Sequence, residues 1–155
     1  MQWRTSNCDT VCGIVMEREI VVDTNVFVAA ARSNRGAAFK LVSMIGKGAF
    51  AIHVSVPLVL EYEQALMEHR ADSGFAVQDI DDLLDYVCAV AKPHRVFFLW
   101  RPELSDPKDD MVLEVAVVGD CDTIVTYNQR DFAGAAAFDI RVSTPGEFLA
   151  DIGAL

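Results

Sequence analysis

Basic residues are scarce in this chain. Its 155 residues include 13 Lys and Arg against 23 Asp and Glu, which gives a formal net charge of -10. Proteins that bind nucleic acids mainly by covering their phosphates have the opposite balance, so the composition argues against that class. It does not exclude a nuclease that holds divalent cations with carboxylates, because the bound cations then supply the positive charge that faces the phosphate.

The chain also lacks paired cysteines and targeting segments. Cys8, Cys12, Cys88 and Cys121 include no Cys-x-x-Cys spacing, which is typical of reduced thiols rather than of a disulfide framework. Cys8 and Cys12 have no second Cys or His pair nearby, so a zinc site there is not expected. Neither end combines a basic segment with a long apolar run. We therefore expect no signal peptide, no membrane-spanning helix and a cytoplasmic protein.

Hydrophobic residues are abundant. They make up 52% of the chain, enough to form one core. Residues 1–17 show no clean periodicity, and we interpret them as a tail, with Met16 as a second candidate start. Residues 18–155 form the predicted domain.

Apolar, β-branched runs alternate with amphipathic stretches from Arg18 onward, as in βαβ units with a parallel sheet. The fold class is therefore α/β. Predicted strands cover 19–23, 50–55, 95–100, 123–126 and 139–142, and predicted helices cover about 26–47, 57–70, 77–91, 106–118 and 145–151.

Asp23 ends the first predicted strand. The carboxyl ends of parallel strands meet at one edge of a sheet, where ligands bind in such folds. The alternative role of Asp23 is to cap the helix beginning near Val26, but Thr24 or Asn25 serves that purpose equally well. We therefore place metal ligation ahead of capping.

Two further acids complete a candidate site. Glu61 lies one turn into the helix that starts at Pro57, at the border of its buried stripe; taken alone, it is more often an ordinary helical acid than a ligand. Asp110 shares a helix face with Leu113 and points inward. Asp106 and Asp109 are explained by capping and first-turn placement. A buried carboxylate is costly without a cation, so a metal would account for Asp110.

The ordered set of these motifs resembles a PIN domain over residues 18–152. The resemblance rests on Ile20-Val-Val-Asp23-Thr-Asn-Val26, Ser55-Val-Pro57 leading to Glu61-Tyr62, Asp110 opening a helix, and Ile124-Val-Thr126 before a polar turn. Thr126-Tyr-Asn128 and Arg130-Asp131-Phe132 are similar to bacterial PIN proteins regarded as toxins of toxin–antitoxin pairs.

The resemblance implies a three-layer α/β/α sandwich around a central, mostly parallel five-stranded sheet. It also implies a ribonuclease that uses Mg²⁺ or Mn²⁺ to hydrolyse RNA phosphodiester bonds, with an antitoxin protein as partner. Asp23, Glu61 and Asp110 match the family's acidic positions. Oxygen ligands suit these hard cations, and His53 and His94 belong to no cluster that would suggest a softer metal.

The family often has a fourth acid where this chain has Asn128, with Asp131 three residues on. An amide offers only a neutral carbonyl oxygen, so a second metal would need Asp131 or the RNA phosphate as an additional ligand. By the same resemblance Thr24, Asn25 and Thr126 orient the site or contact the scissile phosphate, and their roles in capping and turn formation are equally well supported.

The predicted chemistry is attack of an activated water on phosphorus, with no side-chain nucleophile. One carboxylate would accept the proton of that water. RNA would need basic residues around the acidic centre, and the candidates are Arg32, Arg35, Lys40, Lys108 and Arg130. For any single one of them, ordinary solvated surface is the stronger interpretation.

Three other interpretations remain open. An aspartyl phosphatase would use Asp23 as nucleophile, but position 25 is Asn and no Lys ends a later strand. A catalytically degenerate PIN scaffold is favoured slightly by Asn128 and opposed by the three acids, and Mn²⁺ binding would discriminate the two. A homodimer would cover Phe97, Phe98 and Trp100 if these side chains do not fill the core.

Overall fold

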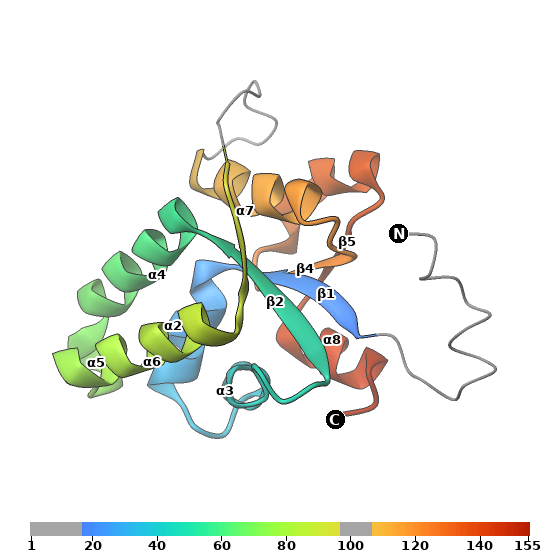
Figure 1. Cartoon of the computed structure of the whole chain (residues 1–155). Helices are drawn as coiled ribbons and strands as arrows, with labels where there is room; N and C mark the ends of the chain where they lie inside the picture. The colour runs from blue at the N-terminus through green and yellow to red at the C-terminus, as the bar shows by residue number, and fades with distance from the viewer. Residues whose placement is uncertain (1–16, 97–106) are drawn as a thin grey trace.

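The computed structural model describes residues 17–96 and 107–155. Five strands form one sheet in the order β3-β2-β1-β4-β5, and every pairing is parallel. The strands are β1 (Arg18–Val22), β2 (Phe50–Ser55), β3 (Lys92–His94), β4 (Thr123–Val125) and β5 (Arg141–Ser143) (Figure 1). The predicted α/β class with a five-stranded sheet is confirmed, and the sheet is wholly parallel.

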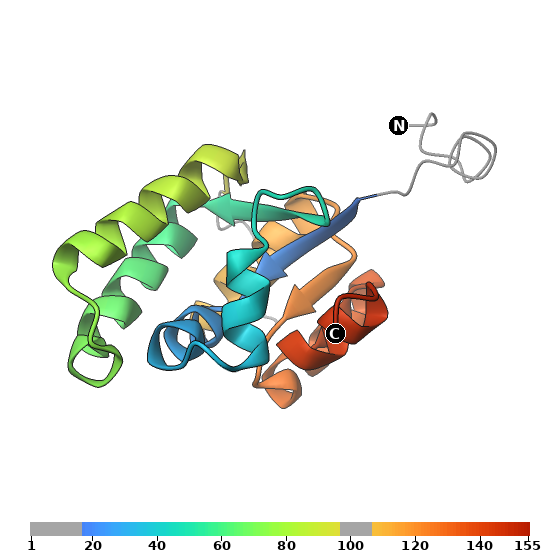
Figure 2. The ribbon, with the colours of Figure 1, turned by 90° about the horizontal axis from the view of Figure 1, so that it is seen from below.

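Helices cover both faces of this sheet. α7 and the 3-10 helix η2 lie on one face, and α2, α3 and α8 lie on the other, with α4 and α6 alongside (Figures 1 and 2). The helices are α2 (Thr24–Arg32), α3 (Ala37–Ser43), α4 (Val56–Glu68), α5 (Arg70–Ser73), α6 (Val77–Val90), α7 (Pro107–Val118), η2 (Gln129–Phe138) and α8 (Pro145–Asp151). The three-layer sandwich is therefore as predicted.

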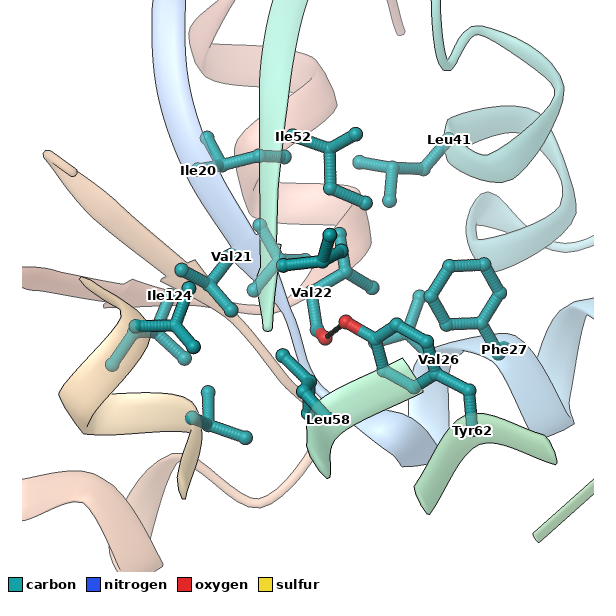
Figure 3. Packing of buried hydrophobic residues seen from close by; sticks show 14 of the residues in the cluster. Ile20, Val21, Val22, Val26, Phe27, Leu41, Ile52, Leu58, Tyr62 and Ile124 are labelled. Carbon is teal, nitrogen blue, oxygen red and sulfur yellow. Dashed lines mark hydrogen bonds between the residues drawn. The ribbon is translucent and has the colours of Figure 1, made fainter. Parts of the chain in front are cut away.

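The core is centred on β1, which is covered on both faces. Ile20, Val21 and Val22 are each 0% exposed, as expected for a central parallel strand. Figure 3 shows these residues packed with side chains from α2, α3, β2 and α4. The next residue, Asp23, is thus fixed by a rigid strand.

Two predicted elements differ from the structure. The predicted helix 26–47 is two helices, since Ser33 is extended (φ -147°, ψ 129°) and ends α2, and Gly36 caps α3. Ser33-Asn34-Arg35-Gly36 contains poor helix formers, and the apolar periodicity on either side concealed the break. Strand β3 lies at Lys92–His94, where Pro93 is tolerated because the strand is at the sheet edge. Of the predicted strand 95–100, residues 95–96 are not in a strand and the rest lie outside the described residues.

Smaller shifts occur near the C-terminus. η2 was not predicted, and β5 begins at Arg141 rather than 139 because Asp139 ends η2 in the left-handed region (φ 60°). Predicted features at 1–16 and 97–106 lie outside the described residues, including Phe97, Phe98 and Trp100, on which the homodimer prediction rests. Among the described helices, none has the length and apolar character needed to span a bilayer.

Candidate functional site

A cavity of about 470 Å³ opens beside the end of β1. The chain runs outward from β1 through β2 to β3, and β4 then pairs with the other side of β1. The carboxyl ends of β1 and β4 thus form the point where strand order reverses, a usual ligand site in such sheets. The cavity is lined by side chains that include Asp23, Asn25, Glu61, Lys108, Asp109 and Asn128.

Asp23 is buried at this point, with 6% of its surface exposed. Its Oδ1 accepts a hydrogen bond from the Thr24 backbone N–H at 2.8 Å, and this contact caps α2. Its Oδ2 accepts from Thr126 Oγ1 at 2.8 Å and from Asn25 Nδ2 at 3.2 Å. Asp23 can therefore cap α2 and line the cavity at once, because the cap uses only Oδ1.

Thr126 and Asn25 hold this carboxylate in a hydrogen-bond network. Thr126 is 0% exposed, and its Oγ1 also accepts from the Asn128 backbone N–H at 3.0 Å. Asn25 Oδ1 accepts from the Tyr127 backbone N–H at 3.3 Å. The turn after β4 is thus tied to the start of α2. Thr126 and Asn25 therefore hydrogen-bond to Asp23 and also stabilise the turn, and a contact with the scissile phosphate stays a prediction.

Glu61 reaches the cavity from the second turn of α4. The Ser55 side chain caps this helix at Leu58, and Pro57 occupies its first turn. The Glu61 side chain is only 14% exposed and forms an ion pair with Lys108, Nζ to Oε1 3.0 Å. The sequence analysis placed Glu61 at the border of the buried stripe, and its low exposure agrees with that placement.

Tyr62 fixes the approach of α4 to β1. Its hydroxyl donates to the Val22 carbonyl oxygen at 2.5 Å (Figure 3), and its ring packs on Phe27 with centroids 4.4 Å apart. Burial and the neighbouring Asp23 charge raise the pKa of Tyr62 well above its usual value, so the hydroxyl stays protonated and remains a donor. Since Tyr62 follows Glu61 directly, this contact holds Glu61 beside the end of β1.

The first turn of α7 contributes two neighbouring acids. Asp109 lines the cavity, whereas Asp110, the acid singled out from the sequence, is not among the lining residues. Asp110 is close to Glu114, which is 5% exposed; burial and the Asp110 charge raise the pKa of Glu114. The sequence analysis assigned Asp109 to the helix terminus alone and overlooked Glu114.

The turn after β4 separates the two remaining predicted ligands. Asn128 lines the main cavity and an adjoining one of about 510 Å³, while Asp131 lines only the adjoining one. Both residues are exposed. Asn128 therefore stands between the acidic centre and Asp131.

Of the five basic candidates, Lys108 and Arg32 line the main cavity. Arg32 pairs with Asp72 at 3.2 Å and contacts His69 Nδ1 at 3.0 Å. Arg130 lines the adjoining cavity, whereas Arg35 and Lys40 line neither. Only part of the predicted basic set is thus at this face.

The donors in the cavity suit a hard divalent cation, because carboxylate, amide and hydroxyl oxygens are the ligands such ions prefer. Within residues 17–96 and 107–155, however, no three Asp, Glu, His or Cys side chains surround a common point closely enough to hold an ion. Asp23 is engaged by Thr126 and Asn25, and Glu61 by Lys108. The protein itself thus satisfies these acids, and ion binding would require side-chain rearrangement.

Comparisons with known proteins place this arrangement in a family. No curated protein matches the sequence. A similar solved structure is the crystal structure of VapBC2 from Rickettsia felis bound to a DNA fragment from their promoter, at 14% identity and a TM-score of 0.57, covering 81% of this chain and 98% of that chain. At that identity the likeness shows the fold. The family model described as PIN domain matches residues 19–130, so this chain belongs to the PIN domain family.

Proposed function

We propose that the protein is a metal-dependent endoribonuclease that hydrolyses RNA phosphodiester bonds. One observation carries this proposal: two nearly buried carboxylates, Asp23 and Glu61, line one cavity at the strand-reversal point of a PIN domain. Buried carboxylates are costly unless cations or hydrogen bonds compensate them. In this protein hydrogen bonds compensate Asp23 and Lys108 compensates Glu61. Because both acids line one open cavity, a divalent cation could take over that compensation.

Asp23 and Glu61 would hold Mg²⁺ or Mn²⁺ together with an acid from the first turn of α7. Asp110 is the acid identified from the sequence, and Asp109 is the one that lines the cavity. When bound, the cation lowers the pKa of a coordinated water and neutralises charge on the phosphate. Thr126, Asn25 and Thr24 orient Asp23, and Tyr62 positions Glu61.

Asn128 and Asp131 are the candidate ligands of a second cation. Asn128 would contribute its carbonyl oxygen, and Asp131 the only formal negative charge among the residues lining the adjoining cavity. We propose that the first cation binds at Asp23 and Glu61 and that any second one depends on Asp131.

We further propose that the protein is the toxin of a toxin–antitoxin pair and acts in the cytoplasm. The Thr126-Tyr-Asn128 and Arg130-Asp131-Phe132 sequence and the fold shared with the VapBC2 structure support this role. An antitoxin would then restrain the activity. Co-expression with the adjacent open reading frame should relieve growth inhibition if this role is correct.

The test of the enzymatic proposal is cleavage of a fluorescent single-stranded RNA in Mn²⁺ by the wild type and acid-to-amide variants. Asp23→Asn and Glu61→Gln should lose cleavage, and comparing Asp109→Asn with Asp110→Asn identifies the acid that α7 supplies. Asp85→Asn is the matched control, because Asp85 is an exposed acid on α6. Equal activity in Asp23→Asn, Glu61→Gln and the wild type would refute the proposal.

A catalytically degenerate PIN scaffold is the second candidate. Asn128 at the position where the family often has an acid favours it. A scaffold would keep the fold and bind no Mn²⁺, whereas the nuclease requires Mn²⁺ binding.

A further inference from the structure

Lys108 forms an ion pair with Glu61, one of the acids at the cavity. Its Nζ lies 3.0 Å from Glu61 Oε1, and both residues line the main cavity. The two side chains differ in surroundings: 14% of the Glu61 side chain is exposed, against 59% of the Lys108 side chain. The carboxylate is thus fixed inside the cavity, and the ammonium reaches it from the solvent side.

Because of this geometry, another cation could replace the Lys108 ammonium at Glu61. Lysine carries a compact charge on a flexible four-carbon stem, and it pays conformational entropy to hold one position. Because 59% of the Lys108 side chain is exposed, water can solvate its ammonium when it leaves Glu61. Glu61 is held by α4 and by the neighbouring Tyr62 contact and stays where it is. An incoming cation would therefore displace the lysine from Glu61.

The other basic side chain in the cavity lining has different partners. Arg32 contacts Asp72 and His69. Lys108 precedes Asp109, which also lines the cavity, so both residues reach it from the first turn of α7. The same turn thus brings Lys108 to Glu61 and an acid, Asp109, to the cavity lining.

We propose that Lys108 is a resident counter-cation of Glu61, which a divalent cation must displace, and that it thereby weakens metal affinity. The Lys108 ammonium and a divalent cation on Glu61 repel each other, so the two occupancies exclude one another. This inference rests on the proposed function, in which Glu61 helps hold the metal. Lys108 is then a residue that sets the metal concentration at which the site fills.

The test is calorimetric titration of the intact protein with Mn²⁺ in wild type and in Lys108→Met, which keeps the aliphatic stem. The Met variant should bind Mn²⁺ about threefold to tenfold more tightly, as expected for loss of one partly exposed ion pair and one nearby like charge. Lys108→Arg retains the charge and should bind as the wild type does. Lys47→Met removes the same charge at a different cavity and should leave the affinity unchanged.

The outcomes separate this inference from the function on which it rests. Wild type that binds no Mn²⁺ would overturn both. Wild type that binds Mn²⁺, with Lys108→Met binding equally or more weakly, would overturn only the role of Lys108. An equal gain in Lys47→Met would also overturn it, because net charge rather than the Glu61 contact would then be responsible. Thermal unfolding of each variant without metal confirms that the fold is retained.

Discussion

The main cavity and a second polar cluster each contain a carboxylate that forms an ion pair with a lysine. The second cluster, here called the histidine cluster, consists of Glu19, His53, Lys92 and His94 on the three neighbouring strands β1, β2 and β3. His53 Nε2 lies 2.6 Å from Glu19 Oε1, and His53 Nδ1 lies 2.6 Å from His94 Nε2. Lys92 Nζ adds an ion pair with Glu19 at 2.9 Å.

Exposure does not separate the two carboxylates, since 19% of the Glu19 side chain and 14% of the Glu61 side chain are exposed. The difference lies in what surrounds the partners of each. Gly119, at the end of α7, packs on the histidine cluster so closely that an added Cβ would lie 2.6 Å from His53 Nδ1. Glu61, by contrast, lines the cavity of about 470 Å³. We therefore expect Glu19 to stabilise the sheet through its contact with His53, and Glu61 to remain accessible to a ligand in the cavity. Polar partners alone therefore do not distinguish a structural cluster from a functional site.

Matched acid-to-amide substitutions give the largest expected contrast. Asp23→Asn should reduce RNA cleavage by about a hundredfold or more, the scale on which metal sites respond to lost contacts, while Asn still caps α2 and preserves stability. Glu19→Gln should leave cleavage unchanged and lower the free energy of unfolding by about 1–3 kcal/mol through lost charged hydrogen bonds. RNA cleavage and urea unfolding of both variants check this, and the reverse pattern would contradict the division of roles.

Gly119→Ala tests the cover of the histidine cluster directly. The added Cβ would also meet His94 Nε2 at 2.9 Å and the Val115 carbonyl oxygen at 3.0 Å. We expect a loss of about 1–3 kcal/mol in stability from this overpacking, with Mn²⁺ affinity unchanged. Thermal denaturation and calorimetry on the same sample measure both. A variant as stable as wild type would show that α7 does not close the cluster.

Tyr62→Phe tests whether the Tyr62 hydrogen bond positions Glu61 at the main cavity. Loss of the bond to the Val22 carbonyl should cost about 1–3 kcal/mol, because that buried acceptor is left without this donor. It should also weaken Mn²⁺ binding, since α4 positions Glu61. Urea unfolding and Mn²⁺ titration are the measurements, with Tyr86→Phe on α6 as the control. Unchanged Mn²⁺ affinity would mean that Tyr62 stabilises the core without positioning Glu61.

The smallest effect expected is a pH dependence of stability. Burial, His53 and Lys92 together lower the pKa of His94 below its usual value. The unfolded chain therefore binds more protons than the folded one as pH falls below about 6.5, and stability declines on acidification through that range. His94→Gln should flatten the decline in unfolding midpoint between neutral and mildly acidic pH. An unchanged slope would assign the dependence to other groups.

Local patterns were enough to predict the sheet and part of the site. β-branched runs predicted three of the strands closely, and the acid ending the first one placed Asp23 at the sheet edge. Glu61 followed from its position on the face of α4. These residues are predictable because strand ends and helix faces are set within a few positions of the chain.

Other features depend on contacts between distant segments. The α7 acids illustrate this: one residue along a helix turns the side chain by about 100°, so choosing Asp110 over Asp109 required a helix phase that the sequence does not determine. The Lys108 contact with Glu61 joins two helices. Glu19, His53 and His94 come together only through the register of three strands, and dispersal along the sequence concealed that cluster.

The most direct test of the central claim is calorimetric titration of Mn²⁺ into the wild type and Asp23→Asn under identical conditions. The account predicts saturable binding to the wild type and loss of most of that binding in the variant, with both proteins folded. Binding of equal affinity and stoichiometry in the two proteins would contradict the assignment of the metal to Asp23.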